Sequence, residues 1–368
     1  MSDTSINYPY SNELKDVINE SVKQTELLKF LSRKGIFYLN ASHEDSSMLT
    51  ARLLLDGNDL NEIRKCAYKN VNKSLLSGFT LESNSNFDLE SIYNSIRNRE
   101  AFKNKGYTLK SLYFVNKTNK TFGGNVEFRR LRPGKTAFLK EEKYEISFVM
   151  KAISEKKWQV EVDGTNSNDG KVIQKLFDMA VRYKEITINE LRLDNLSNTN
   201  TITFFDRLAK EGLDDDWAIA DILRLTLRRS KDKKELEGFE DENEIIDEEG
   251  KDEDVKETTK EQLSGISQAI LEGKNLRENK FVRMAEEDGY LFSSMTYMFE
   301  HKKNNSHIQL RAEFKGSPKI FEVSLEGFSE PNSDTDESGT VLTDEQNYRY
   351  RAIFWNSATR IYRELLSV

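Results

Sequence analysis

Two carboxylates on one alternating stretch of sequence are the residues best placed to do chemistry in this chain. Glu161 and Asp163 stand two positions apart in WQVEVDG, so a strand would direct both side chains to one side of its sheet. With Lys171 nearby, these acids could hold a divalent cation and cleave a phosphodiester. The same alternation has a simpler explanation, in which Val160 and Val162 face the dry side of a sheet and the acids face water. We prefer the simpler explanation and keep a metal-dependent nuclease or phosphoesterase as an alternative.

Other catalytic and metal-binding patterns in the sequence are incomplete. The turn RPGK has Arg129 where a phosphate loop needs its first glycine. The polar loop at 163–170 would place Leu176 where a calcium loop needs a bidentate glutamate. A single cysteine, Cys66, excludes a zinc site built from several thiolates of this chain. We therefore expect no metal and no cofactor, and we lean against an enzyme.

Arginine and lysine side chains gather in two places where they could neutralise phosphates. The predicted hairpin EFRRLRPGK carries one cluster, and the predicted helix end RLTLRRSK carries the other. The eight nucleic-acid-binding candidates are Arg129, Arg130, Arg132 and Lys135 on the hairpin, and Arg224, Arg228, Arg229 and Lys231 on the helix. Clustered cations bind a nucleic-acid backbone by releasing its counterions. The helix cluster also has another explanation, because three aspartates precede it and a helix dipole favours acids first and cations last.

The pattern around these candidates predicts an α+β fold, with antiparallel β-meander units that are each covered by helices. Stretches between residues 107 and 164 alternate apolar with polar residues and are separated by turn-forming residues. Apolar residues at helical spacing predict several helices in residues 1–75 and further helices at 172–183, 214–231 and 262–273. Three strands follow, and then a last helix that begins at Thr343 with Gln346 as its capping partner.

These elements suggest four parts: a helical N-terminal unit (1–75), an α+β domain with an antiparallel sheet (76–234), an acidic flexible linker (235–262) and a second α+β unit (263–368). The stretches LLDGNDLNE and ILEGKNLRE are similar, and each precedes an aromatic-Val strand that ends in acid-Gly. A divergent internal duplication would explain both similarities. Chance is the rival explanation, because a glycine after an acid is a common way to end a helix or strand.

The charge of the chain is concentrated in one segment. Residues 235–261 hold 14 acidic and 3 basic residues, so the rest of the chain has a net charge of +3, whereas the whole has −8. A segment this charged cannot bury enough apolar surface to offset its ordering entropy, which predicts a flexible linker. The same segment could instead mimic a nucleic acid and compete for a basic face. We expect a cytoplasmic protein with no membrane partner, because no secretory signal or apolar run of membrane length is present.

A composition rich in Lys, Asn and Ile, together with the acidic linker, resembles that of accessory proteins from AT-rich bacterial mobile elements and antiviral islands. The resemblance implies a role in antiviral defence. Our leading hypothesis is a non-catalytic binding protein, an accessory subunit of a bacterial cytosolic assembly, that docks a protein partner and contacts nucleic acid. A purely protein-binding scaffold remains a further alternative. The sequence leaves open the oligomeric state and the choice between DNA and RNA.

Overall fold

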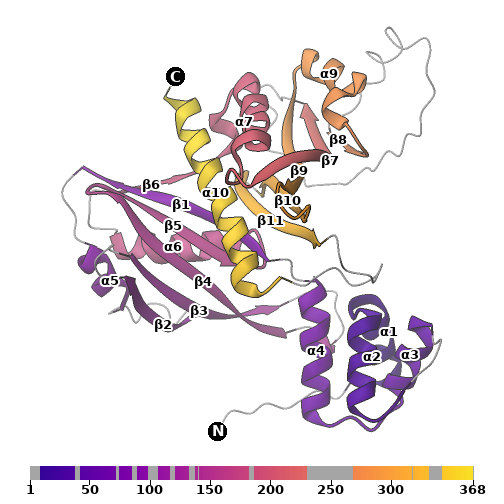
Figure 1. Cartoon of the computed structure of the whole chain (residues 1–368). Helices are drawn as coiled ribbons and strands as arrows, with labels where there is room; N and C mark the ends of the chain where they lie inside the picture. The colour runs from indigo at the N-terminus through magenta and orange to yellow at the C-terminus, as the bar shows by residue number, and fades with distance from the viewer. Residues whose placement is uncertain are drawn as a thin grey trace. The chain divides into compact units, whose positions relative to one another are not determined.

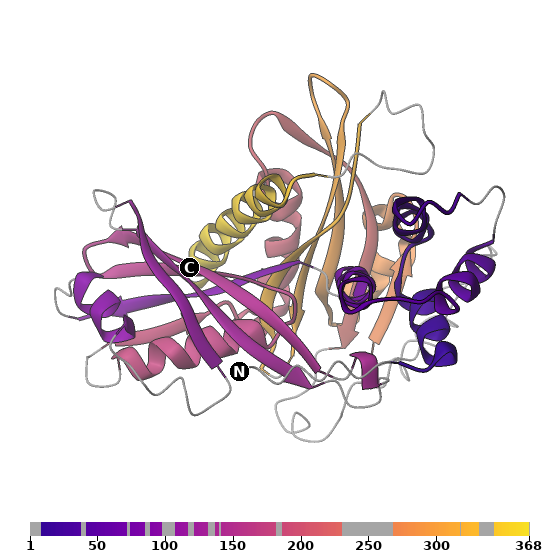
Figure 2. The same ribbon diagram turned by 90° about the horizontal axis from the view of Figure 1, so that it is seen from below.

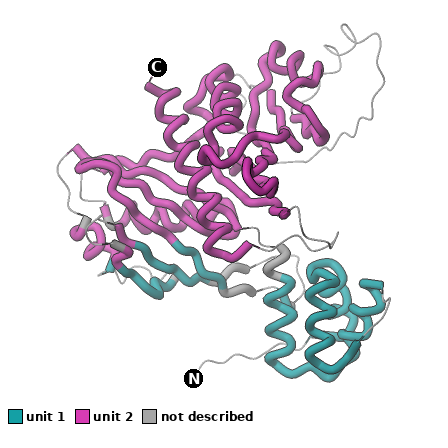
Figure 3. Tube along the Cα trace, in the orientation of Figure 1, with its two compact units in different colours: residues 1–73, 97–113, 123–147 teal, residues 74–96, 114–122, 148–368 magenta. Residues whose placement is uncertain are grey.

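The computed structural model of this chain has two compact units (Figure 3). We call residues 1–73, 97–113 and 123–147 the first unit, and residues 74–96, 114–122 and 148–368 the second unit. The structure describes residues 9–37, 42–71, 74–84, 89–97, 107–116, 121–131, 137–139, 141–181, 186–229, 268–316, 318–330 and 342–367.

The described residues form the helices and strands that are labelled in Figure 1. The α-helices are α1 (Ser11–Ser21), α2 (Gln24–Arg33), α3 (His43–Ala51), α4 (Gly57–Val71), α5 (Leu89–Arg97), α6 (Asp169–Val181), α7 (Asn198–Glu211), α9 (Lys280–Glu287) and α10 (Asp344–Leu366). The strands are β1 (Leu75–Ser83), β2 (Tyr107–Asn116), β3 (Thr121–Leu131), β4 (Glu141–Ser154), β5 (Lys157–Gly164), β6 (Ile186–Glu190), β7 (Trp217–Arg229), β8 (Gln268–Glu272), β9 (Tyr290–His301), β10 (His307–Lys315) and β11 (Ile320–Ser329).

The first unit contains the helices predicted for the start of the chain. On α1, Leu14, Val17 and Ile18 recur at helical spacing and are buried. They belong to a hydrophobic core shared by α1, α2, α4 and a short 3-10 turn at Ala137–Leu139. Helix α3 begins after Ser42, whose hydroxyl accepts a hydrogen bond from the Asp45 backbone N–H at 3.1 Å.

The described strands form one antiparallel sheet of eleven strands, and the predicted α+β fold is thereby confirmed. The order is β2-β3-β4-β5-β1-β11-β10-β9-β7-β8, and β6 pairs with β1 beside this path. Strand β1 therefore lies between β5 on one side and β11 on the other, and it connects β2–β5 to β9–β11 within the sheet. The predicted boundary at 235–262 falls between β7 and β8, which pair with each other in this sheet.

Within the second unit, the two faces of the sheet meet different helices (Figure 2). On one face, Phe79 of β1 and Phe148 of β4 make edge contacts with Phe177 of α6. On the other face, Phe354 of α10 packs against Tyr297 of β9, with ring centroids 5.5 Å apart. We call these the α6 face and the α10 face. The buried aromatic residues on both faces supply much of the apolar surface that folding removes from water.

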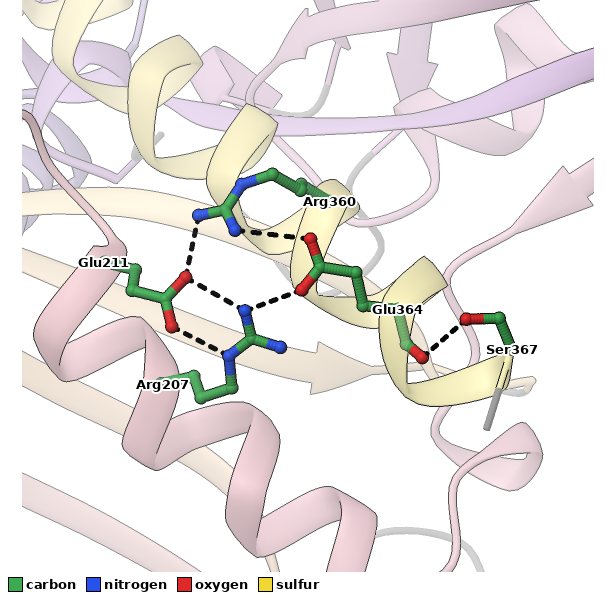
Figure 4. A network of polar contacts seen from close by, with 5 residues as sticks. All are labelled: Arg207, Glu211, Arg360, Glu364 and Ser367. Atoms are coloured by element: carbon green, nitrogen blue, oxygen red, sulfur yellow. Dashed lines mark hydrogen bonds and ion pairs between the residues drawn. The ribbon is translucent and has the colours of Figure 1, made fainter.

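An ion-pair network joins α7 to α10 within the second unit (Figure 4). Arg207 of α7 contacts Glu211 at 2.8 Å and Glu364 of α10 at 2.6 Å, and Arg360 of α10 contacts Glu211 at 2.9 Å. The hydrogen bonds from Arg207 lower the pKa of the Glu211 carboxyl to about 2, although partial burial opposes the shift. Because all four side chains are partly exposed, we assign the network a modest role in fixing the helix pair.

The prediction of a helix at 214–231 is wrong, because residues 217–229 form the strand β7. Its pairing with β9 shifts register at three places, and two of these shifts, between Ile219 and Asp221 and between Ile222 and Arg224, insert an extra residue into β7. The inserted residues bring Trp217, Ile222, Leu225 and Leu227 into the hydrophobic core at uneven spacing. Such spacing is close to that of a helix, which explains the error. The helix predicted at 262–273 is also wrong for its described residues, since 268–272 form strand β8.

The internal duplication is not confirmed. Of the two similar stretches, the first runs through a non-regular segment into α4, which begins at Gly57. The second runs from strand β8 through Gly273 into a 3-10 turn at Leu276–Glu278. Because equivalent positions form different elements, the shared residues give no structural support to a repeat.

The last helix is confirmed, with its predicted cap. The Thr343 hydroxyl accepts a hydrogen bond from the Gln346 backbone N–H, and the Gln346 side chain accepts one from the Thr343 backbone N–H. This reciprocal pair satisfies two backbone donors at the start of α10. Among the residues that the structure describes, no helix is long and apolar enough to cross a membrane.

Candidate functional site

The predicted acid Glu161 lies at the centre of a buried polar cluster between β5 and α10. Lys151 Nζ of β4 lies 2.8 Å from Glu161 Oε1 and 2.9 Å from Oε2. Tyr348 of α10 donates its hydroxyl to Oε2 at 2.6 Å, and Gln159 Nε2 donates to Oε1 at 3.1 Å. The Glu161 side chain is 0% exposed. Four donated hydrogen bonds therefore saturate this carboxylate within the fold.

The second predicted acid, Asp163, pairs with a buried arginine of the same helix. Arg351 Nη1 lies 2.7 Å from Asp163 Oδ1, and the Arg351 side chain is 2% exposed. Arg351 Nε also donates to Asn347 Oδ1 at 2.7 Å. A buried guanidinium without a charged partner would be costly, so Asp163 is needed where it stands.

The electrostatics of this cluster favour the protonated form of the Tyr348 hydroxyl. Burial raises the pKa of the Tyr348 hydroxyl well above its ordinary value, and the neighbouring charge of Glu161 adds to that shift. The phenol therefore remains a proton donor to Glu161 over the whole pH range in which proteins are stable.

The expectation that both acids face water is wrong for Glu161. Helix α10 lies across this face of β5 and brings Tyr348 and Arg351 to the two acids. The approach is possible because Gly78, the register partner of Glu161 on β1, has no side chain. A Cβ atom at Gly78 would lie 2.7 Å from the ring of Trp355. A single-strand pattern carries no information about a helix that follows about 180 residues later.

Lys171, the third residue of the alternative catalytic set, is not brought to the two acids. It lies on α6, and α6 covers the opposite face of the sheet from α10. In the part of the chain that the structure describes, no three His, Cys, Asp or Glu side chains are grouped so that they could hold a metal ion. The arrangement around Glu161 and Asp163 is thus one of internal ion pairs.

The predicted nucleic-acid-binding residues fall into three groups. Arg224, Arg228 and Arg229 lie on strand β7 and not on a helix, so the helix-dipole explanation of this cluster no longer applies. Arg129 and Arg130 lie on strand β3, and the structure describes only the backbone of these two residues. The remaining three, Arg132, Lys135 and Lys231, lie outside the described residues, as does the acidic linker at 235–262.

The arginines of β7 have defined neighbours. Arg224 is paired across the ladder with Thr296 of β9 on one side and with Glu272 of β8 on the other. Its Nε lies 3.0 Å from Glu272 Oε1, and its side chain is 39% exposed. Arg228 is partly buried, and Arg229 at the end of the strand is exposed.

The same side of the sheet carries a polar row that the sequence reasoning missed. Thr296 is also the register partner of Arg311 on β10, so Arg224 and Arg311 are next-but-one neighbours across the sheet. Arg311 Nη2 lies 2.9 Å from Glu313 Oε1, and Arg311 Nε donates to the Ser294 hydroxyl at 3.1 Å. The signal was present in HIQLRAEFK, where polar residues alternate with buried apolar ones.

Comparisons with known proteins do not assign this chain to a family. No protein-family model matches the chain, and no curated protein matches it. One solved structure with weak similarity is DynU16, a putative protein in the dynemicin biosynthetic locus, with a TM-score of 0.16 and 10% sequence identity. Another is the di-domain ARO/CYC BexL from the BE-7585A biosynthetic pathway, with a TM-score of 0.14 and 9% identity. Each comparison covers 79% of this chain, with 98% of DynU16 and 97% of BexL.

Proposed function

We propose that this protein is a non-catalytic binding protein, an accessory subunit of a bacterial cytosolic assembly, whose β7 arginines contact nucleic acid. The observation that carries the proposal is the placement of Arg224, Arg228 and Arg229 on one strand next to the short outermost strand β8. Arg224 and Arg228 are partly exposed and Arg229 is exposed, and cations at such positions can neutralise phosphates of an extended backbone. A role in antiviral defence is supported only by the compositional resemblance.

The state of the two acids supports the non-catalytic part of the proposal. A metal-dependent nuclease needs carboxylate oxygens that are free to bind the cation. Glu161 instead accepts hydrogen bonds from Lys151, Tyr348 and Gln159, and Asp163 neutralises a buried arginine. Using either acid as a metal ligand would leave a buried donor without its partner. The protein-scaffold alternative has less support, because the internal repeat that would have supplied two similar docking faces is not confirmed.

The proposal is tested by binding of the full chain to labelled single-stranded DNA, RNA and duplex DNA across a salt series. We expect affinity that falls steeply with salt for the wild type. In the double variant Arg224→Glu, Arg228→Glu, affinity should fall at least about tenfold, and the salt slope should decrease by about two. Arg283→Glu is the matched control, because Arg283 is exposed on α9 and belongs to neither cluster.

Two results would overturn the proposal. One is no binding by the wild type at low salt, and the other is an equal loss of affinity in the Arg283 control. The same samples, incubated with Mg²⁺ or Mn²⁺, also test the nuclease alternative. Cleavage that is lost in Asp163→Asn, while binding is kept, would favour that alternative over a non-catalytic protein.

A further inference from the structure

Strands β10 and β11 place two carboxyl side chains directly opposite each other. Glu313 and Glu322 are register partners in the antiparallel ladder. Side chains at such positions have Cβ atoms only about 4.5–5.5 Å apart and share one face of the sheet. Glu322 is 5% exposed, so water can do little to screen the repulsion between two ionised groups.

The two carboxyl groups have different partners, an arginine beside Glu313 and a hydroxyl beside Glu322. Arg311 of β10 forms its ion pair with Glu313 at 2.9 Å, and Lys315 lies further along the same strand. Glu322 accepts a hydrogen bond from a neutral group, the Ser167 hydroxyl, with 3.1 Å between the two oxygens. A proton on Glu322 would therefore remove the repulsion and leave the Arg311 ion pair intact.

Glu322 lines a small cavity. The cavity lies beside β1, between two stretches of that strand that have different partners. Leu75 and Leu76 pair with β11, and the residues from Phe79 onward pair with β6. The lining includes Ser77 and Gly78 of β1, Lys171 of α6 and Glu190 of β6, besides Glu322 itself. The cavity has room for about one water molecule.

The other carboxylate of the cavity is already neutralised, because Glu190 lies 2.6 Å from Arg192. Lys171 is the cation that reaches the cavity from the α6 side. The charged groups around Glu322 are therefore two carboxylates and two ammonium groups. The carboxylates are Glu313, which is paired with Arg311, and Glu190, which is paired with Arg192. The ammonium groups are those of Lys171 and Lys315.

We propose that Glu313 and Glu322 form a proton-binding site, in which the pair holds one proton on Glu322 in weakly acidic solution and releases it as the pH rises through neutrality. The direction of the pKa agrees with this geometry. Burial raises the pKa of the Glu322 carboxyl to about 7; the hydrogen bond from Ser167 opposes the shift, and the charge of Glu313 adds to it.

The site makes folding depend on pH with a defined sign. An unfolded glutamate has its ordinary pKa of 4.5, so between about 4.5 and 7 the folded chain holds a proton that the unfolded chain has lost. The stability of the fold therefore falls as pH rises through this window and levels off above it. For one proton, the folding equilibrium constant falls up to about tenfold for each pH unit within the window.

Urea unfolding of the full chain between pH 5.5 and 8.5 tests the site, with infrared detection of the protonated carboxyl group as a second readout. Glu322→Gln keeps the shape of the side chain and an acceptor for Ser167, but it cannot ionise. We expect this variant to have a higher urea midpoint than the wild type at pH 8 and a flatter pH dependence. Glu287→Gln, at an exposed glutamate of α9, is the control and should keep the wild-type pH dependence.

The infrared spectrum decides the outcome even if Glu322→Gln fails to fold. Wild-type protein labelled at its glutamates should show a protonated carboxyl band at pH 6 that disappears by pH 8.5. Absence of that band at pH 6, or an unchanged pH dependence in a folded Glu322→Gln variant, would overturn the proposal. Neither measurement involves nucleic acid, so the result is independent of the proposed function.

Discussion

At the scale of single residues, a carboxylate can be buried for structural reasons in the place where a catalytic site is sought. Glu161 and Asp163 share a face of β5, as the alternation in the sequence predicts. Their partners lie on β4 and on α10, and the sequence of β5 alone does not predict them. Partners that are distant in sequence decide whether an acid is available for chemistry.

The hydrogen bond from Tyr348 to Glu161 should contribute measurably to stability. In Tyr348→Phe the ring remains, but the charged acceptor loses one of its donors. Because hydrogen bonds to charged groups are stronger than neutral ones, we expect the free energy of unfolding to fall by about 2 kcal/mol. Urea denaturation monitored by circular dichroism would measure this loss.

Tyr350→Phe is the matched control for that measurement. Tyr350 lies on the same helix and makes an edge contact with Trp217 through its ring, which the substitution keeps. We expect a change below about 0.5 kcal/mol in this variant. Equal losses in the two variants would show that the hydroxyl of Tyr348 does not stabilise the cluster.

At the scale of elements, regular alternation was predictable and irregular alternation was not. Strands β5, β10 and β11 follow the apolar and polar pattern closely, and all were predicted as strands. Strand β7 carries two extra residues where its pairing with β9 shifts register, and they displace its apolar residues into a spacing that resembles that of a helix. The capping residues of α10 were predictable, because a capping box is a local arrangement of two nearby side chains.

The contact between β1 and α10 depends on the absence of a side chain at Gly78. In Gly78→Ala, the added Cβ atom would overlap the backbone oxygen of Val160 and the ring of Trp355. Because two rigid groups must move, we expect a loss of about 1–3 kcal/mol in the free energy of unfolding. Gly327→Ala serves as the control, since a Cβ atom there meets the Gln309 side chain at an ordinary 3.4 Å. A loss no larger than that of the control would contradict the close packing of Trp355 on β1.

At the scale of the whole molecule, the fold class was predictable and the order of the strands was not. Local patterns identify strands, but the pairing of β1 with β5, β6 and β11 joins segments separated by about 80 to 250 residues. For the same reason the sequence suggested two α+β parts, whereas the described strands form one sheet. The polar row around Arg311 and Glu322 also depends on that order.

The net charge of the chain should control its affinity for polyanions. Removal of residues 235–261 changes the net charge from −8 to +3, by loss of 14 acidic and 3 basic residues. Since long-range repulsion then becomes attraction, we expect affinity for single-stranded nucleic acid to rise on the order of tenfold at low salt. The same binding assay with labelled nucleic acid would measure the change. An unchanged affinity at low salt would mean that this segment does not oppose binding.

The positions of the three tryptophans give the protein a built-in optical reporter. Trp158 lies on β5, Trp217 on β7 and Trp355 on α10, and each side chain is at most 8% exposed. Indole emission shifts to longer wavelength when water reaches the ring, so separation of α10 from the sheet would expose Trp355 and redden the spectrum. Phenylalanine substitutions at Trp158 and Trp217 would leave a single fluorophore whose colour reports the docking of the last helix.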